Sequence, residues 1–216
     1  MKTVIAIDGP AASGKSSVAH ELALRLGFGY VNSGAFYRTI TWWVIQQGLD
    51  PLAPDTVSEA LVSANFVSGF EDYQAYFHVN QGDADPHLRA DGVNQNVSPV
   101  SRIPAIRDTI TRHLRDLAED RDIVMEGRDI GSVVFPETPF KFYIDASPEV
   151  RKQRRSAQGQ TDEIAVRDRI DSSRPNSPLI IAEDALVIDS THLTVDGVVG
   201  EVIGRLKLKG LPVRSR

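Results

Sequence analysis

Residues 3–17, TVIAIDGPAASGKSS, decide the fold of this chain of 216 residues. Residues 3–8 form a short, mostly apolar run, which predicts a buried strand. Residues 9–16 fit the pattern G-x-x-x-x-G-K-[ST], and Val18, Leu22 and Leu26 follow at the four-residue spacing of a helix. The order strand, glycine-rich loop and helix predicts a phosphate-binding loop, rather than a tight turn with an exposed lysine.

This loop has the residues needed to hold a nucleoside triphosphate and Mg²⁺. Backbone N–H groups of a glycine-rich turn can point at phosphate oxygens, and the N-terminus of the following helix adds a partial positive charge. We expect Lys15 to reach the β and γ phosphates and Ser16 to offer its hydroxyl to Mg²⁺. The residues predicted to bind ATP here are Gly9, Pro10, Ala11, Ala12, Ser13, Gly14, Lys15, Ser16 and Ser17.

The rest of the chain alternates strand-like and helix-like segments. Apolar runs predict strands at 29–31, 122–126, 140–145 and 185–189, and periodicity predicts helices at about 35–47, 103–119, 148–157, 162–173 and 195–209. Residues 65–90 instead contain short β-like runs broken by Gly and Asn, which predict a small inserted meander. We therefore expect one domain over residues 1–216, a three-layer α/β sandwich of the P-loop NTPase type. Its central sheet should be mostly parallel, with an insertion at about residues 63–95.

Composition excludes several classes of protein. A hydrophobic fraction of 41% with 25% charged residues is typical of a globular chain and excludes a disordered or fibrous one. The net charge of -5 argues against a general nucleic-acid or membrane-surface binder. The chain has no cysteine, no signal-peptide pattern and no membrane-length apolar run, and its histidines are not spaced as zinc ligands. We expect a cytoplasmic monomer with no nucleic-acid or membrane partner.

Arginines follow several of the predicted strands and helices. Arg38 and Arg128 stand after NSGAFY and MEG, and a cluster comprises Arg151, Arg154, Arg155, Arg167, Arg169 and Arg174. A solvated charged face is the alternative interpretation, above all for Arg151, Arg167 and Arg169. Two phosphate-bearing substrates that meet end to end need their negative charges neutralised at both ends, which guanidinium groups can do. Because phosphoryl transfer is mainly positioning and charge neutralisation, the combination predicts a phosphotransferase.

The sequence lacks the signatures of other nucleotide-binding classes. It has neither an N-K-x-D element nor a strand that ends in an Asp-Glu pair, which argues against a GTPase or an ATPase motor. Asp145 comes nearest to such an acid, and we expect it to cap the helix that begins near Pro148. No carboxylate base is evident, whereas a phosphate acceptor needs none, because it is largely dianionic at pH 7.

Five motifs resemble those of bacterial cytidylate (CMP) kinases, which are P-loop nucleoside monophosphate kinases. The motifs are GPAASGKSS (9–17), NSGAFYR (32–38), VNQNVSPVSRIPAIR (93–107), EGRDIGSVVFP (126–136) and RDRIDSSRPNSPL (167–179), the last leading into ALVIDS (185–190). Two departures from the family pattern are Asn32 and Glu126, where an Asp is usual. The span between Arg155 and Arg167 also looks short.

The resemblance implies transfer of the γ-phosphoryl group of ATP to CMP or dCMP, with Mg²⁺. It places Ser33, Gly34, Tyr37 and Arg38 at the monophosphate site, with Arg38, Arg128 and Arg174 on its phosphate and Asp171 on the ribose. Asp129, Arg107 and Ser98 would read the base, since cytosine offers an N4 donor and acceptors at N3 and O2. Arg154 and Arg155 would lie on a lid at about residues 151–174 that closes over ATP. The implied catalytic residues are Lys15, Arg38, Arg128, Arg154 and Arg174.

Several alternatives remain open at this point. Ser98, which precedes Pro99, could be a helix N-cap, and Arg107 could be a surface residue of a helix. The acceptor could be UMP or a small hydroxy acid, and the chain could be a nucleotide-binding regulatory module or an ATPase switch.

Overall fold

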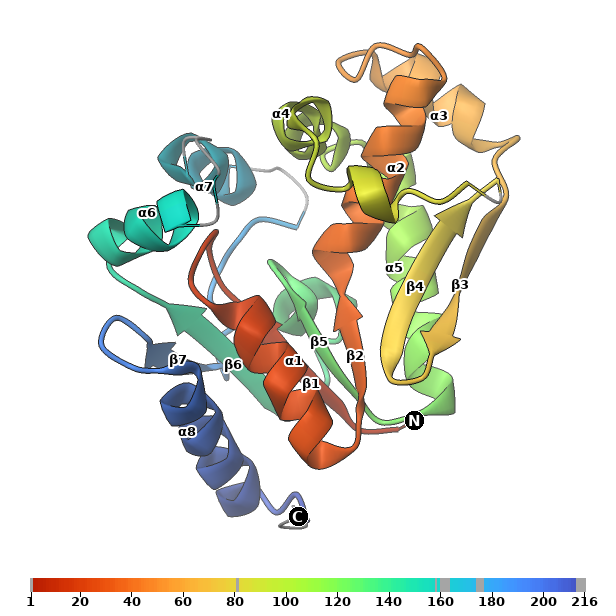
Figure 1. Ribbon diagram of the computed structural model, residues 1–216. Coiled ribbons are helices and arrows are strands. Elements are labelled where there is room, and N and C mark those ends of the chain that lie inside the picture. Colours follow the sequence, from red (N-terminus) through yellow and green to blue (C-terminus); the bar gives the residue numbers. More distant parts are fainter. Residues whose placement is uncertain (1, 81, 158, 160–163, 174–176, 213–216) are drawn as a thin grey trace.

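The computed structural model describes residues 2–80, 82–157, 159, 164–173 and 177–212, and its described strands form one seven-stranded sheet (Figure 1). The strands are β1 (Val4–Asp8), β2 (Gly29–Asn32), β3 (Phe66–Glu71), β4 (Gln74–Val79), β5 (Ile123–Gly127), β6 (Phe140–Asp145) and β7 (Leu186–Asp189), in the order β3-β4-β2-β5-β1-β6-β7. All neighbouring strands pair in parallel except β3 with β4, which form an antiparallel hairpin. The mostly parallel α/β sheet is thus confirmed, and the segment predicted as a small meander contains the two-stranded β3–β4 hairpin.

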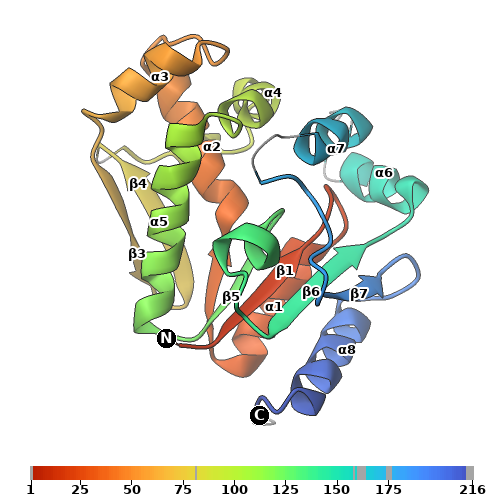
Figure 2. The same ribbon diagram turned by 180° about the vertical axis from the view of Figure 1, so that it is seen from behind.

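Helices cover both faces of this sheet. They are α1 (Lys15–Leu26), α2 (Ser33–Gln46), α3 (Pro54–Leu61), α4 (Asp91–Val100), α5 (Pro104–Asp120), α6 (Pro148–Ala157), α7 (Ile164–Ser172) and α8 (Val195–Leu208), with short turns at Asp85–His87 and Ile130–Val134. Helices α1 and α8 lie in front of the sheet in Figure 1. Helix α5 covers the other face of the sheet, which is turned toward the viewer in Figure 2. The turn Ile130–Val134 is π-helical. Helices α3 and α4 were not predicted.

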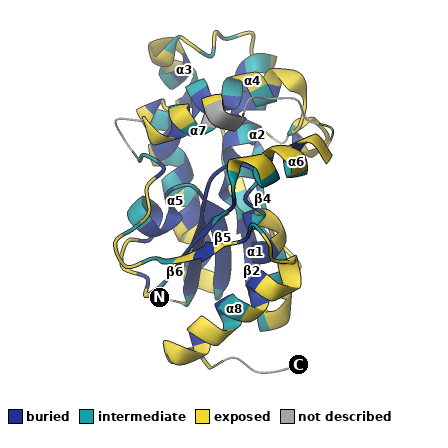
Figure 3. Cartoon of the chain, turned by 90° about the vertical axis from the view of Figure 1, so that its left-hand side faces the viewer, coloured by how far each residue is buried: buried dark blue, intermediate teal, exposed yellow. Residues whose placement is uncertain are grey.

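The alternation of side chains along β1 divides the core into two layers. Ile5 and Ile7 pack with residues of α1 and α8, whereas Val4 and Ala6 pack with residues of α2 and α5. Figure 3 shows the buried strands between helices whose outer faces are exposed. This arrangement gives the three layers expected from the sequence. In the part of the chain that the structure describes, no helix is both long and apolar enough to cross a membrane.

The cap of α6 differs from the prediction. Ser147 Oγ accepts the N–H of Val150 at 3.3 Å, whereas Asp145 Oδ1 accepts the N–H of the adjacent Ala146 at 2.8 Å. Asp145 is the last residue of β6, so it lies too early in the chain to reach the first turn of α6. The prediction that Asp145 caps this helix was therefore wrong.

Candidate active site

A cavity of about 810 Å³ opens at the edge of the sheet where β1, β2 and β5 end. A pocket of this volume can hold a ligand of nucleotide size. Its lining comes from the phosphate loop, the start of α2, α4, the loop after β5, and α6 and α7. In Figure 1, α6 and α7 stand on one side of this edge and α2 and α4 on the other.

The predicted phosphate loop has the backbone of an anion site. Gly9 has φ +154°, and a Cβ at this position would lie 2.1 Å from the carbonyl oxygen of Ile144, so only glycine fits. Gly14 precedes α1 with φ 92°, and no side chain caps this helix N-terminus. The first-turn N–H groups of a helix point outward from its N-terminus, where an anion can accept hydrogen bonds from them. Lys15 Nζ donates to the carbonyl of Pro10 at 3.1 Å.

Glu126 lies beside this loop at the end of β5. It is 2% exposed, and its Oε2 lies 4.0 Å from Lys15 Nζ. Tyr30 donates its hydroxyl to Glu126 Oε1 at 3.1 Å, and burial together with the Glu126 charge raises the pKa of Tyr30. In the sequence, Glu126 stands out only as a departure from a family pattern. The feature of the sequence that could have indicated a role for Glu126 is an acid at the end of a predicted buried strand. Only the order of the strands in the sheet shows that this acid lies next to Lys15.

Arg128 and Asp171 line the cavity beside the phosphate loop. Arg128 Nη1 donates to the carbonyl of Gly9 at 2.8 Å, and its Nε donates to Asp171 Oδ2 at 3.0 Å. Arg128 thus joins the loop after β5 to both the phosphate loop and α7. The guanidinium group can hold a phosphate that lies next to the phosphate loop.

The residues predicted to read a base form a buried cluster. Arg107 is 5% exposed, forms an ion pair with Asp129, and its guanidinium carbon lies 5.3 Å from the centre of the Tyr37 ring. The alternative that Arg107 is a surface residue was therefore wrong. Ser98 is buried within α4, so the alternative that it caps a helix N-terminus was also wrong.

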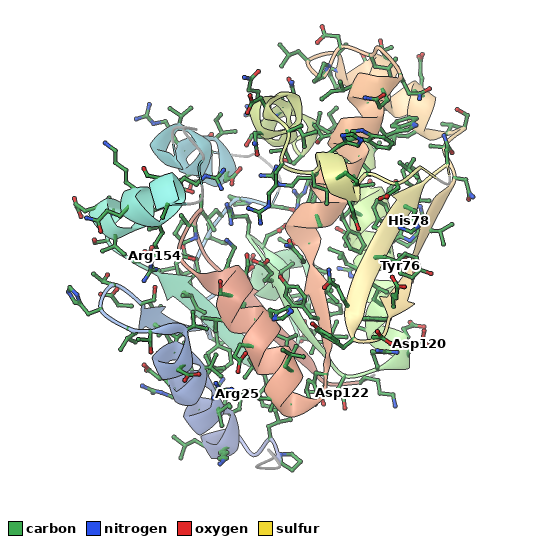
Figure 4. All side chains as sticks on the ribbon, viewed as in Figure 1. Arg25, Tyr76, His78, Asp120, Asp122 and Arg154 are labelled. Atoms are coloured by element: carbon green, nitrogen blue, oxygen red, sulfur yellow. The ribbon has the colours of Figure 1, made fainter. Side chains whose placement is uncertain are left out.

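Lid and insertion residues also contact the site. Arg38 donates to the carbonyl of Leu88 and to Asn94 Oδ1, both at 2.7 Å. Arg154 extends from α6 toward the phosphate loop (Figure 4) and donates to the carbonyls of Ser13 at 3.1 Å and Ser190 at 2.7 Å.

Helices α6 and α7 are joined to the phosphate loop by a charged pair. Asp168 Oδ1 accepts the N–H of Ala11 at 3.0 Å, and Arg151, which forms an ion pair with Asp168, donates to the Ala11 carbonyl at 3.2 Å. Arg151 is therefore no solvated surface residue. Arg169 is exposed, as the alternative interpretation expected. Sequence reasoning gave Asp168 no role, because its partner lies 157 positions away in the chain.

Most of the predicted site residues meet in the cavity. Its lining includes Ala11, Ala12, Ser13, Gly14, Lys15, Ser16, Ser17, Ser33, Gly34, Tyr37, Arg38, Ser98, Arg128, Asp129, Arg154, Arg155 and Asp171. Gly9, Pro10 and Arg107 do not line it: the two loop residues offer their carbonyls to Arg128 and Lys15, and Arg107 pairs with Asp129. Arg174 lies outside the described residues.

The phosphate loop at the carboxyl edge of a mostly parallel sheet, with arginines that line the same cavity, defines a P-loop kinase. The family model described as Cytidylate kinase matches residues 5–208. A cytidylate kinase of Rhodococcus opacus (strain B4) is 39% identical over 212 residues, which cover 93% of each chain. One of Mycobacterium leprae (strain Br4923) is 39% identical over 216 residues, 94% of this chain and 95% of the relative. A solved sugar kinase from Janibacter sp. HTCC2649 aligns over 100% of both chains with a TM-score of 0.45 and 15% identity. The chain belongs to the cytidylate kinase family.

Proposed function

We propose that this enzyme transfers the γ-phosphoryl group of ATP to CMP and dCMP. The observation that carries the proposal is that Arg128 and Asp129 line the same cavity as the phosphate loop. Arg128 suits an acceptor phosphate, and Asp129 suits the N4 amino group of cytosine. Membership of the cytidylate kinase family supports the same reaction.

Catalysis on this proposal is alignment and charge neutralisation. The loop amides and Lys15 hold the donor phosphates, while Arg38, Arg128 and Arg174 hold the acceptor phosphate. Arg154 and Arg155 act from the lid at 151–174. The acceptor oxygen attacks as part of a dianion, so the enzyme needs no side-chain base.

Ser16 and Glu126 fit a magnesium ion. Ser16 stands in the first turn of α1, and Glu126 is a buried carboxylate beside Lys15, so the donor set is the oxygen type that Mg²⁺ prefers. The ion pair between Glu126 and Lys15 is long, at 4.0 Å, so a second cation could share the carboxylate. When bound there, Mg²⁺ would neutralise charge on the β and γ phosphates.

The remaining parts of the site divide between acceptor and donor. We propose that Asp171 binds the ribose, that Ser33, Gly34 and Tyr37 line the monophosphate site, and that Ser98 and Arg107 assist Asp129 with the base. The segment at about 63–95 is then the monophosphate-binding insertion. Since every residue assigned here belongs to one chain, the proposal is satisfied by a monomer, which sedimentation velocity can test.

The test is a coupled ADP-release assay with ATP and Mg²⁺, in which CMP, dCMP, UMP, AMP and GMP are offered separately. We expect rapid ADP formation with CMP and dCMP only. Equal activity with UMP would refute the assignment of Asp129. Slow ADP formation that is independent of any acceptor would identify an ATPase switch instead.

Asp129→Asn tests the base assignment directly. An amide can donate to the O4 of uracil as well as accept from cytosine, so we expect the preference for CMP over UMP, measured as kcat/KM, to narrow by roughly 10-fold or more. Asp108→Asn, which changes an exposed acid next to Arg107 on α5, serves as the control and should leave the preference unchanged. An unchanged preference in Asp129→Asn would move base reading to other residues.

A further inference from the structure

Asp8 is a buried acid to which the reaction as described gives no role. It ends β1 directly before the phosphate loop and is 5% exposed. Both carboxylate oxygens are used: Oδ1 accepts the N–H of Ile130 at 2.8 Å, and Oδ2 accepts the N–H of Gly131 at 2.7 Å. These two amides directly follow Arg128 and Asp129, so Asp8 holds the loop that carries both residues.

The register of the sheet explains why Asp8 can do this. β1 and β5 are parallel neighbours, and Asp8 lies opposite Gly127. The carboxylate at the end of one strand therefore meets the loop that leaves the other. A Cβ at Gly131 would lie 3.4 Å from Asp8 Oδ2, which is an ordinary contact, and 3.1 Å from Lys141 Cγ, so the glycine mainly makes room for the Lys141 side chain.

A further hydrogen bond joins the same two segments, and here a side chain of the loop after β5 donates to the backbone of the phosphate loop. Arg128, from the loop after β5, donates to the carbonyl of Gly9, which follows Asp8. Residues 8–9 and 128–131 are thus cross-linked by three hydrogen bonds. On the proposed function, one loop holds the donor phosphates and the other holds the acceptor, so these bonds would set the distance between the two substrates.

Stability does not account for an acid at this position. Burial raises the pKa of Asp8 to about 7, with the Asp129 charge acting in the same direction and the two N–H bonds and Lys15 opposing it. A carboxyl whose pKa is raised on folding makes the folded state less stable when it is ionised. Ionisation of Asp8 therefore costs the folded state stability, although its two hydrogen bonds are well formed.

We propose that Asp8 is a positioning residue for phosphoryl transfer, which fixes Arg128 and Asp129 relative to the phosphate loop. The proposal rests on the proposed function, since it assigns the acceptor to Arg128 and Asp129. A misplacement of about 1 Å in a reacting group can cost about 100-fold in rate. Loss of the Asp8 carboxylate should therefore lower kcat and leave ATP binding to the phosphate loop intact.

The test is Asp8→Asn, which keeps the shape of the side chain but turns an NH₂ group toward one of the two N–H donors. We expect kcat with CMP to fall by about 10- to 100-fold and the CMP over UMP preference to narrow. The dissociation constant of ATP, measured by calorimetric titration without acceptor, should change less than about twofold. An unchanged kcat, or a loss of ATP affinity equal to the loss of kcat, would overturn the proposal.

Asp122→Asn is the matched control. Asp122 Oδ1 accepts the N–H of Thr3 at 2.6 Å, which is the same kind of tie between a carboxylate and backbone at the opposite end of β1. We expect this variant to keep its kcat and its CMP preference. If Asp122→Asn lowered kcat as much as Asp8→Asn does, the Asp8 effect would be general destabilisation and the proposal would fail.

Gly131→Ala is the second variant, and it tests the positioning role of Asp8 if Asp8→Asn does not fold. The added methyl group would lie 3.1 Å from Lys141 Cγ and 3.4 Å from Asp8 Oδ2, so it crowds the hydrogen bond between Asp8 and Gly131 while residue 8 stays unchanged. We expect the same lower kcat and unchanged ATP affinity, and an unaltered kcat would overturn the proposal. The wild-type enzyme is assayed beside the variants. If the wild type does not convert CMP, the proposed function is wrong. If the wild type and both variants are fully active, the proposed function stands and only the role assigned to Asp8 is wrong.

Discussion

At the scale of single residues, Arg128 joins the two halves of the site. It donates both to the phosphate loop and to Asp171, and its side chain is mostly buried. A partly desolvated guanidinium that already has two acceptors is held in one orientation before a substrate arrives. Such preorganisation is what charge stabilisation in a transition state requires.

Arg128→Ala should therefore lower kcat/KM for CMP by about 100-fold or more, because the acceptor phosphate loses a charge-assisted donor. Steady-state kinetics measure this change, and circular dichroism with thermal melting checks the fold. Arg25→Ala is a suitable control, since Arg25 pairs with Glu21 and Asp196 on an exposed surface. Near-normal activity of Arg128→Ala would refute the assigned role.

Asp8 also makes a testable contribution to the pH dependence of stability. Its folded-state pKa of about 7 lies above the ordinary value of about 3.9. Between these values the folded protein binds more protons than the unfolded chain, so the contribution of Asp8 to stability is present at low pH and is lost as pH rises toward and through 7. The free energy of unfolding of wild type minus that of Asp8→Asn should decrease from pH 5 to pH 8. Urea titrations measure the difference, and a constant value would contradict the raised pKa.

At the scale of elements, the β3–β4 hairpin depends on packing against α2 and α5. Phe77 points inward, where its ring stacks on Phe36 at 4.5 Å and lies 5.2 Å from the ring of His113 on α5. The neighbouring Tyr76 and His78 stack on each other on the other face of the hairpin (Figure 4). The alternation expected of a strand with one buried face is thus present in β4.

We expect Phe77→Ala to lower the free energy of unfolding by about 3–5 kcal/mol, since it leaves a cavity between α2, α5 and the hairpin. Chemical denaturation at constant pH measures the loss. Tyr76→Ala on the opposite face is the matched control and should cost less, because Tyr76 is only half-buried. Equal losses in the two variants would mean that the hairpin does not take its stability from this core.

Helices and strands were predicted correctly where a local sequence pattern specifies them. They were missed where tertiary packing, rather than local propensity, stabilises the element. Strand β6 was placed at 140–145 because its apolar run is bounded clearly, and α6 was placed at 148–157. Helix α4 was missed because its sequence, DGVNQNVSPV, contains glycine, asparagine and proline, which are poor helix formers. Its Val93, Val97 and Val100 are buried, so tertiary packing compensates for the weak intrinsic propensity.

At the scale of the whole molecule, the two core layers share one sheet, so we expect the chain to unfold in a single cooperative transition. ATP with Mg²⁺ at about 100 times its dissociation constant should add about 2.7 kcal/mol of stability, or roughly 5–10 °C in Tm. Scanning calorimetry measures both effects, and Lys15→Ala should lose most of the ligand-induced shift. Two separate transitions would show that the insertion or the lid folds independently, contrary to the single domain.

The sequence alone determined the phosphate loop and the class of fold, because both are encoded in neighbouring residues. Glycines at fixed spacing set a backbone conformation, and apolar residues at period two or 3.6 set a strand or a helix. The resemblance to cytidylate kinases supplied the residues expected around the acceptor. Most of these now line one cavity.

Only the tertiary structure decided which distant residues meet. Asp8 and the amides it binds lie 122 and 123 positions apart, and Glu126 reaches Lys15 only because β5 pairs with β1. Strand order and register create these contacts, and neither can be read from the spacing of residues along the chain. Asp8 holds its loop partners because folding stacks the ends of two parallel strands at one edge of the sheet.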